Sequence, residues 1–346
     1  LDGLATVPLL AAELMDHRRP RKFTTTEFVE GILRGDTSIL SQAVTLVESS
    51  RHEHQQQAQE IIERCLPHTG HSVRIGITGV PGAGKSTSID VFGMHVLKRG
   101  HKLAVLAIDP SSERSKGSIL GDKTRMEALA REKNAFIRPS PTAGSLGGVA
   151  RKTRETIILC EAAGFDTVFV ETVGVGQSET AVHSMVDFFL LIQLAGTGDE
   201  LQGIKRGIME MADGIVINKA DGDNIRRAEM AAGHFRNALH LFPPTESGWF
   251  PKVLTYSGYY GLGIDEVWAM IDEYIAFTKQ NGYFDRKRNR QAKYWMYESI
   301  HDMLRDAFYR HPGIEERLPI VEQQVLHNEI SSFVAAKEMM DIFLKK

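Results

Sequence analysis

The eight residues from Gly79 to Ser86 have the types and spacing of a loop that binds a phosphate chain. They read Gly-Val-Pro-Gly-Ala-Gly-Lys-Ser, follow an apolar run that reads as a buried strand, and fit G-x-x-x-x-G-K-[ST]. In such a loop the backbone N–H groups turn toward the phosphates, Lys85 reaches the outer phosphates, and the Ser86 hydroxyl holds Mg²⁺. The pattern predicts a nucleoside triphosphate site with the contact residues Gly79, Pro81, Gly82, Ala83, Gly84, Lys85, Ser86 and Thr87.

A second motif favours guanine over adenine as the base. The residues Asn218-Lys219-Ala220-Asp221 follow an apolar run and fit N-K-x-D. The Asp221 carboxylate can accept two hydrogen bonds from guanine N1–H and its exocyclic amine, whereas adenine offers no matching donor pair. The backbone after the next strand is expected to contact the base oxygen, although Gly258 stands where alanine is usual in GTPases. GTP and GDP are therefore the predicted ligands, with base contacts from Asn218, Lys219, Asp221, Ser257, Gly258 and Tyr259.

Three acidic residues are candidates for the metal. Glu171 opens Glu-Thr-Val-Gly at the place where GTPases commonly carry D-x-x-G, Asp109 ends an apolar run, and Asp122 lies in a polar segment. Mg²⁺ typically takes one or two carboxylates together with phosphate and water, so not all three need be direct ligands. We favour Asp122 as the switch ligand, and a carboxylate at Glu171 can reach the metal through a water.

Three polar loops are expected to respond to hydrolysis. They cover residues 109–125, 171–179 and 196–205, and the last is equally well explained as a glycine-containing turn. Lys85 and Mg²⁺ would neutralise the developing phosphate charge, and Gln177 is a candidate for orienting water. Because no arginine finger is evident, we expect slow hydrolysis unless a partner completes the site.

Composition and charge exclude several classes of function. The 346 residues are 42% hydrophobic and 25% charged, as in an ordinary globular protein. The formal charge of -3 argues against an electrostatic footprint for nucleic acid or an anionic membrane. No apolar run approaches the roughly 18 to 20 residues that a membrane span needs. We expect neither a nucleic-acid partner nor a membrane span.

Cysteine usage points to a reducing compartment. Cys65 and Cys160 are far apart and belong to no C-x-x-C pair, so neither a disulfide framework nor a cysteine metal site is predicted. A cytoplasmic location is the simplest interpretation. The chain opens at Leu1 rather than Met, so a removed leader would instead fit the mitochondrial matrix. The basic patch from Arg18 to Lys22 is either a remnant of such a leader or a solvated linker.

The elements that must position these motifs follow an α/β pattern. We predict a P-loop NTPase fold with a mostly parallel sheet flanked by helices, N-terminal helices and a C-terminal helical arm, divided at 1–71, 72–281 and 282–346. Each motif lies at the C-terminal end of a strand, where open α/β sheets bind ligands. Strands are expected at 73–78, 103–108, 134–138, 166–171, 187–194, 213–218 and 252–256, and helices near 85–98, 146–163, 200–211, 225–240 and 264–279.

The segments before and after the α/β region are both predicted to be helical. Thr24 and Glu27 fit a capping box, and Phe23 and Phe28 occupy the staple positions around it. In the C-terminal arm the basic stretch 286–290 is interpreted as a solvated helix start, followed by two helical patterns. The arm has apolar stripes without a domain-sized core, so it should pack on the main domain or on a second subunit.

Taken together, the motifs closely resemble those of the MeaB/MMAA/ArgK family of P-loop GTPases over roughly residues 35 to 280. The resemblance implies a homodimer that chaperones adenosylcobalamin-dependent methylmalonyl-CoA mutase, gates cofactor loading and protects the mutase from inactivation. It also implies that Glu171 belongs to a glutamate-containing switch and that Lys205 closes the third mobile loop. Because D-x-H-x-x-G is missing, cobalamin is not expected to bind this chain alone. The motifs are Val80–Thr87, Asp109–Ser112, Gly117–Met126, Glu171–Glu179 and Asn218–Asp221.

Three other functions remain open at this point. A P-loop kinase of the older ArgK transport-system type would bind adenine, against which Asp221 argues. A nickel-delivery GTPase should show a Cys/His cluster beside the P-loop, and the sequence has none there. A mainly structural dimer would bind nucleotide only to hold its arm, and its GTP and GDP states would bind a partner equally.

Overall fold

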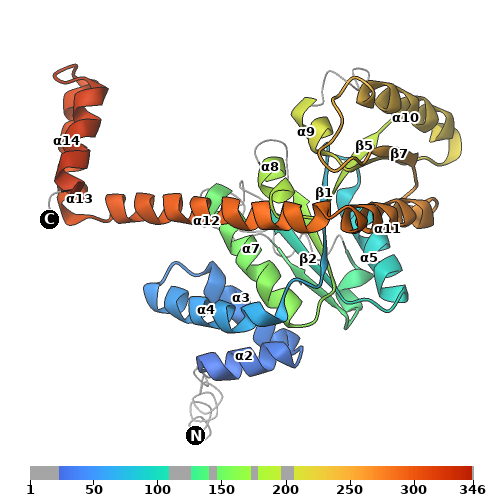
Figure 1. The fold of residues 1–346 in the computed structure, drawn as a ribbon, viewed down its shortest axis with the longest axis horizontal. Coiled ribbons are helices and arrows are strands. Elements are labelled where there is room, and N and C mark those ends of the chain that lie inside the picture. The colour runs from blue at the N-terminus through green and yellow to red at the C-terminus, as the bar shows by residue number, and fades with distance from the viewer. Residues whose placement is uncertain (1–22, 109–125, 140–145, 173–177, 196–205, 345–346) are drawn as a thin grey trace, which may run out of the picture.

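A parallel sheet of seven strands forms the centre of the chain (Figure 1). The computed structural model describes residues 23–108, 126–139, 146–172, 178–195 and 206–344. The strand order is β3-β2-β4-β1-β5-β6-β7, and every neighbouring pair is parallel. The predicted fold is confirmed, and each strand ends within one residue of its predicted bounds. The strands are β1 (Val73–Gly79), β2 (Leu103–Ile108), β3 (Ala135–Arg138), β4 (Thr167–Thr172), β5 (Phe188–Leu194), β6 (Gly214–Asn218) and β7 (Lys252–Thr255).

Helices cover both faces of the sheet because the central strands are apolar on both sides. One face packs on α5 (Lys85–Lys98) and α11 (Ile264–Gln280), which bring Phe92, Trp268 and Tyr274 onto Ile77 and Leu190. The opposite face is covered by α7 (Leu146–Ala162), α8 (Ser178–His183), α9 (Arg206–Met211) and α10 (Ile225–Leu239). Short 3₁₀ turns lie at Leu66–His68, Leu129–Arg131 and Gly222–Asn224.

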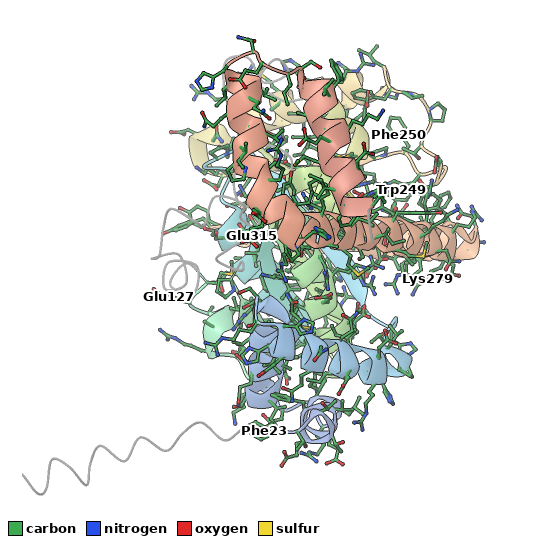
Figure 2. The ribbon with its side chains drawn as sticks, turned by 90° about the vertical axis from the view of Figure 1, so that its left-hand side faces the viewer. Phe23, Glu127, Trp249, Phe250, Lys279 and Glu315 are labelled. Atoms are coloured by element: carbon green, nitrogen blue, oxygen red, sulfur yellow. The ribbon has the colours of Figure 1, made fainter. Side chains whose placement is uncertain are left out.

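The C-terminal arm consists of three helices, so the prediction of two helical patterns was wrong. The long helix α12 (Tyr283–Tyr309) crosses the body and extends beyond it, and α13 (Pro312–Leu326) and α14 (Ser332–Leu344) pack together at its far end (Figures 1 and 2). Proline at the first position of α13 starts a new helix there. Around Ile314 and Met339 the last two helices bury a small apolar cluster of their own.

The basic stretch 286–290 is not simply a solvated helix start, as the sequence suggested. Helical spacing places Lys287 on the face that packs on the body, where it is 6% exposed and its Nζ donates to the backbone oxygen of Asp187 at 2.7 Å. Arg288 pairs with the buried Asp187 carboxylate at 2.7 Å and donates to the backbone oxygens of Gly70 and Ser72. These two cations anchor α12 to the sheet, while the others in the stretch are exposed.

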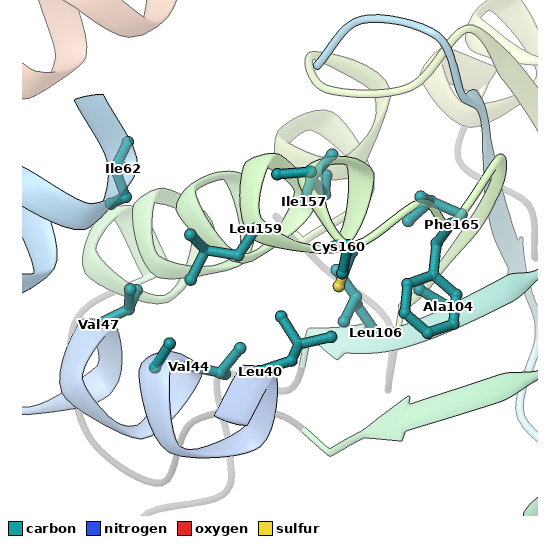
Figure 3. Packing of buried hydrophobic residues seen from close by; sticks show 14 of the residues in the cluster. Leu40, Val44, Val47, Ile62, Ala104, Leu106, Ile157, Leu159, Cys160 and Phe165 are labelled. Atoms are coloured by element: carbon teal, nitrogen blue, oxygen red, sulfur yellow. The ribbon is translucent and has the colours of Figure 1, made fainter. Parts of the chain in front are cut away.

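The N-terminal helices pack as the sequence predicted. The capping box between Thr24 and Glu27 is present, and the rings of Phe23 and Phe28 lie 5.4 Å apart. The apolar face of the second helix packs on α7 through Leu40. Figure 3 shows this packing, with Leu40, Val44 and Val47 facing Leu159 and Cys160 across the interface. The three helices are α2 (Thr25–Leu33), α3 (Thr37–Glu48) and α4 (His52–Cys65).

Both cysteines are buried and unbonded, so the structure contains no disulfide. Burial raises the pKa of the Cys65 thiol to about 11, and burial also raises the pKa of Cys160. None of the described helices combines the length and the apolar composition that a bilayer crossing requires.

Candidate functional site

The phosphate-binding loop connects β1 to the N-terminus of α5. Gly82 and Gly84 adopt the left-handed region, with φ of 79° and 83°. A Cβ on Gly79 would lie 2.2 Å from the backbone oxygen of Ile192, so only glycine fits this approach to β5. The loop opens toward the first turn of α5, whose unpaired N–H groups form an anion site. Pro81, Gly82 and Thr87 are exposed, Gly84, Lys85 and Ser86 are half-buried, and Gly79 and Ala83 are buried.

Lys85 spans the loop that precedes it. Its Nζ donates to the backbone oxygen of Gly79 at 3.0 Å. Burial lowers the pKa of Lys85, and the carboxylates of Glu171 and Glu179 oppose that shift by stabilising the ammonium. Glu171 is buried at the end of β4, where it is aligned with Ile77 of the neighbouring β1. The lysine and this carboxylate are thus placed at the edge of the sheet where phosphates and a cation would meet.

The guanine motif lies at the end of β6, two strands away from β1 in the sheet. Asn218 is buried and Lys219 has a φ of 61°, which turns the chain sharply after the strand. Asp221 accepts a hydrogen bond from the hydroxyl of Ser257 at 2.6 Å, so the loop after β7 orients the carboxylate. The N–H of Gly258 donates to Asn218 Oδ1 at 3.0 Å, and the side chain of Tyr259 is 82% exposed. The structure therefore brings the two predicted base-contact segments together.

Asn218 also links the base site to the phosphate site. Its Nδ2 donates to the backbone oxygen of Ala83 at 2.7 Å, and a Cβ on Gly84 would lie 2.7 Å from the same nitrogen. One buried amide thus holds the phosphate-binding loop against both guanine segments. Glycine is required at position 84 by this contact as well as by its backbone angle.

A second link between the two halves could not be read from the sequence. Tyr256, the residue after β7, is buried and its ring stacks on Phe92 of α5 at 5.4 Å between centroids. Its hydroxyl shares a 2.5 Å hydrogen bond with Ser88 Oγ, and Ser88 also donates to the backbone oxygen of Gly84 at 2.8 Å. No motif identifies this pair, because Tyr256 and Ser88 are 168 residues apart in the chain.

We predict that Tyr256→Phe weakens nucleotide binding by loosening the Gly84 turn. The expected loss of GDP affinity is about 5-fold, corresponding to one neutral hydrogen bond of roughly 1 kcal/mol. Calorimetry with GDP measures this loss, and thermal unfolding measures stability in parallel. Ser88→Ala should cause a similar loss, with no further loss in the double variant if the two act as one link. An unchanged GDP affinity with lowered stability would show that the link serves the fold alone.

The structure describes only some of the predicted metal and switch residues. Asp109, Asp122, Gln177 and Lys205 lie outside the described residues. Among the side chains that the structure describes, no group of three or more His, Cys, Asp or Glu could hold a metal by itself. Ser86 at the start of α5 and Glu171 at the end of β4 supply oxygen donors at the phosphate end of the site, which suits Mg²⁺ shared with a nucleotide.

Comparisons with known proteins agree with this geometry. The family model "Methylmalonyl Co-A mutase-associated GTPase MeaB" matches residues 40–312. A protein of Caulobacter vibrioides described as a putative GTPase is 49% identical, covering 97% of this chain and 99% of its own length. The mouse protein "Methylmalonic aciduria type A homolog, mitochondrial" is 43% identical over 99% of this chain and 86% of its own. A crystal structure titled "LAO/AO transport system kinase" superimposes with a TM-score of 0.73 at 36% identity, covering 94% of this chain and 99% of that one.

The family match extends over most of the described body, through the whole of α12 and to the first residue of α13, and it includes the phosphate-binding loop and the guanine motif. With the P-loop, Asp221 and the parallel sheet in the arrangement described, the chain belongs to the MeaB family and is a GTPase.

Proposed function

We propose that this GTPase serves an adenosylcobalamin-dependent acyl-CoA mutase, methylmalonyl-CoA mutase, by gating cofactor loading and protecting the mutase from inactivation. The observation that carries the proposal is the match to a mutase-associated family over residues 40–312. Cobalamin is expected to reach this protein's complex through the partner, because the sequence lacks the D-x-H-x-x-G element.

The proposed chemistry is displacement of the γ-phosphoryl group of GTP by water. Lys85 is half-buried beside Glu171 and would exchange its bond to Gly79 for phosphate oxygens. Mg²⁺ would be held by Ser86 together with carboxylates from Asp109, Asp122 or Glu171, and would supply charge neutralisation on the outer phosphates. Gln177 would orient water.

Nucleotide state would reach the mutase through loops that leave the same edge of the sheet. We propose that segments 109–125, 171–179 and 196–205 change order between GTP and GDP, with Lys205 closing the third. The described ends of the second segment support this role. Glu171 and Glu179 are the two end residues of segment 171–179, and both carboxylates interact with the charge of Lys85. A change at the phosphates, which alters the surroundings of Lys85, would therefore act on both ends of this segment.

Homodimer formation through the C-terminal arm is part of the proposal. In its C-terminal half, α12 exposes large apolar side chains at helical spacing, including Met296, Ile300, Met303 and Leu304, each more than a third exposed. An apolar stripe on a helix that leaves the body is typical of a subunit interface. A second copy of the same stripe is the partner that closed two-fold symmetry would supply.

The test is a mutase-loading experiment with defined nucleotide states. Apo methylmalonyl-CoA mutase from the same organism is mixed with the chain and with GDP or a non-hydrolysable GTP analogue. We expect complex formation by analytical ultracentrifugation, and a rate of adenosylcobalamin uptake, followed by absorbance, that differs at least about 10-fold between the two nucleotides.

The Lys85→Ala variant is the control, because its complex should no longer respond to the nucleotide. Absence of a complex in every nucleotide state would refute the mutase role. A complex that forms equally with GDP and the analogue would instead favour a structural dimer whose nucleotide only holds the fold.

A further inference from the structure

A cavity of about 690 Å³ lies at the opposite end of the sheet from the nucleotide site. Its walls come from the end of α8, from α9, from the segment 239–251 before β7, and from the first turns of α12. The residues that line it near the sheet, such as Asp213 and Trp249, precede β6 and β7, whereas Asp221 and Ser257 follow those strands. The cavity volume is within the usual range for small-molecule sites.

The lining is mostly apolar and rich in aromatic rings. Trp249 and Phe242 supply aromatic rings, and Met211 and Leu239 supply aliphatic surface. Phe250, which also lines the cavity, is 53% exposed, and it is labelled beside Trp249 in Figure 2. Aromatic side chains add apolar area to such a lining, and contacts between their edges or free faces and a flat apolar ligand add to area burial.

The charges at the cavity are already neutralised. The Nζ of Lys287 lies 3.4 Å from the Asp213 carboxylate, Arg290 pairs with Glu246, and the carboxylate of Glu210 pairs with Arg206 at 3.1 Å. Burial, reinforced by Lys287, lowers the pKa of His183 to about 4, so its imidazole is neutral at physiological pH. An ionic ligand would find no unpaired countercharge among the described lining residues, so a neutral one is favoured.

One polar group in the wall lacks a partner. Gln291 is 6% exposed, and its Nε2 donates to the backbone oxygens of Val186 and His183 at 2.8 and 3.4 Å. Both amide hydrogens are thus used, which fixes the orientation of the side chain, yet its Oε1 is buried without a donor among the described residues. This oxygen is closed off from the cavity space, so it is an internal cost of the wall and is not a ligand contact.

The cavity is joined to the nucleotide site by the short helix α8. Its first turn carries Glu179, which acts on the charge of Lys85, and its last residue is His183 in the cavity wall. The segment after α8 is held by α12, because Lys287, Gln291 and Trp295 all donate side-chain hydrogen bonds to backbone oxygens between residues 183 and 187. A shift of α8 therefore has to be accommodated at the cavity.

We propose that this cavity binds a neutral, largely apolar small molecule, and that its occupancy changes the affinity for guanine nucleotide through α8. The binding part stands on the cavity alone, and the coupling part rests on the proposed guanine site. Because coupling is reciprocal, nucleotide must change the affinity for the cavity ligand by the same factor.

Two fluorescent probes of one scaffold test the site. N-phenyl-1-naphthylamine is neutral and carries one N–H, whereas 8-anilino-1-naphthalenesulfonate adds an anionic group to the same rings. The variant Gly207→Phe fills the cavity from α9, where an added Cβ would meet no atom within 4 Å. The matched control is Gly233→Phe on α10, where a Cβ is equally unobstructed and the residue is outside the cavity lining.

The neutral probe should bind the wild type at one saturable site and at least about 10-fold more tightly than the sulfonate. We expect Gly207→Phe to weaken the neutral probe about 10-fold or more and Gly233→Phe to leave it unchanged. Gly207→Leu adds a smaller side chain and should give an intermediate loss of affinity for the neutral probe. It replaces Gly207→Phe in the test if the phenylalanine variant folds poorly. Equal binding of the neutral probe to the wild type and both filled variants would overturn the site.

The coupling is measured by GDP calorimetry with and without saturating neutral probe. We expect the GDP affinity of the wild type to change at least about 5-fold and that of Gly207→Phe not to respond. An unchanged affinity in the wild type would overturn the coupling. If GDP does not bind even without probe, the guanine site is refuted while the probe series still decides the cavity. If the probe or Gly207→Phe dissociates a dimer in the ultracentrifuge, the cavity belongs to a subunit interface and the proposal is overturned.

Discussion

Replacing Lys85 by alanine is expected to lower the rate of GTP hydrolysis by about 10³-fold or more, which is the scale for removing a cation that stabilises phosphoryl transfer. The structure places its Nζ 3.0 Å from the backbone oxygen of Gly79, inside the turn that the phosphates would occupy. Alanine removes the positive charge that lies near the carboxylates of Glu171 and Glu179, so electrostatic repulsion of the phosphates adds to the loss. Single-turnover release of phosphate at saturating GTP measures the effect.

The other end of the same helix supplies the control for Lys85. Lys98 is exposed in the last turn of α5, and Lys98→Ala removes an equal charge without touching the site. We expect its hydrolysis rate to stay within about 2-fold of the wild type, as for a surface charge. Because Lys85 faces the buried carboxylates of Glu171 and Glu179, the thermal midpoint of Lys85→Ala is measured in parallel, which separates a loss of stability from a loss of catalysis. A hydrolysis rate of Lys85→Ala near that of Lys98→Ala would contradict the assigned role.

The sheet could be predicted from the sequence because each strand is a short apolar run bounded by polar residues. For buried parallel strands this pattern is nearly unambiguous, so β2 begins and ends at the predicted residues Leu103 and Ile108. The capping box at Thr24 was equally clear, since it depends on residues three positions apart. Local signals of this kind determined the fold class without knowledge of any long-range contact.

The features that the sequence did not reveal depend on long-range contacts. Lys287 and Arg288 were interpreted as solvated because charge runs usually are, yet α12 lies against the sheet and turns both cations toward Asp187 and Asp213. The Tyr256–Ser88 link and the cavity are likewise formed by segments that are distant in the chain. The division into three domains and the roles assigned to single site residues stay predictions.

Asp221 should decide which base the protein binds. The substitution Asp221→Asn keeps an oxygen that can accept from N1–H and from the Ser257 hydroxyl, which now donates to Asp221 at 2.6 Å, so the loop should stay in place. The new NH₂ group faces the exocyclic amine of guanine, donor against donor, but it matches the C2 carbonyl of xanthine. We expect GDP affinity to fall about 100-fold or more and xanthosine diphosphate to become the preferred ligand, as measured by calorimetry.

The neighbouring Asp223 gives a matched control, because it is exposed two residues further along the same loop. Asp223→Asn removes the same charge, so any general electrostatic effect on a polyanionic ligand appears in both variants, whereas only Asp221→Asn should exchange guanine for xanthine. Adenine nucleotides should bind neither variant better than the wild type. If instead ADP bound the wild type as tightly as GDP, the carboxylate would not read the base, and a P-loop kinase would become the better account of the site. A switch to xanthine confined to Asp221→Asn would tie the base preference to one carboxylate that the loop after β7 holds in place.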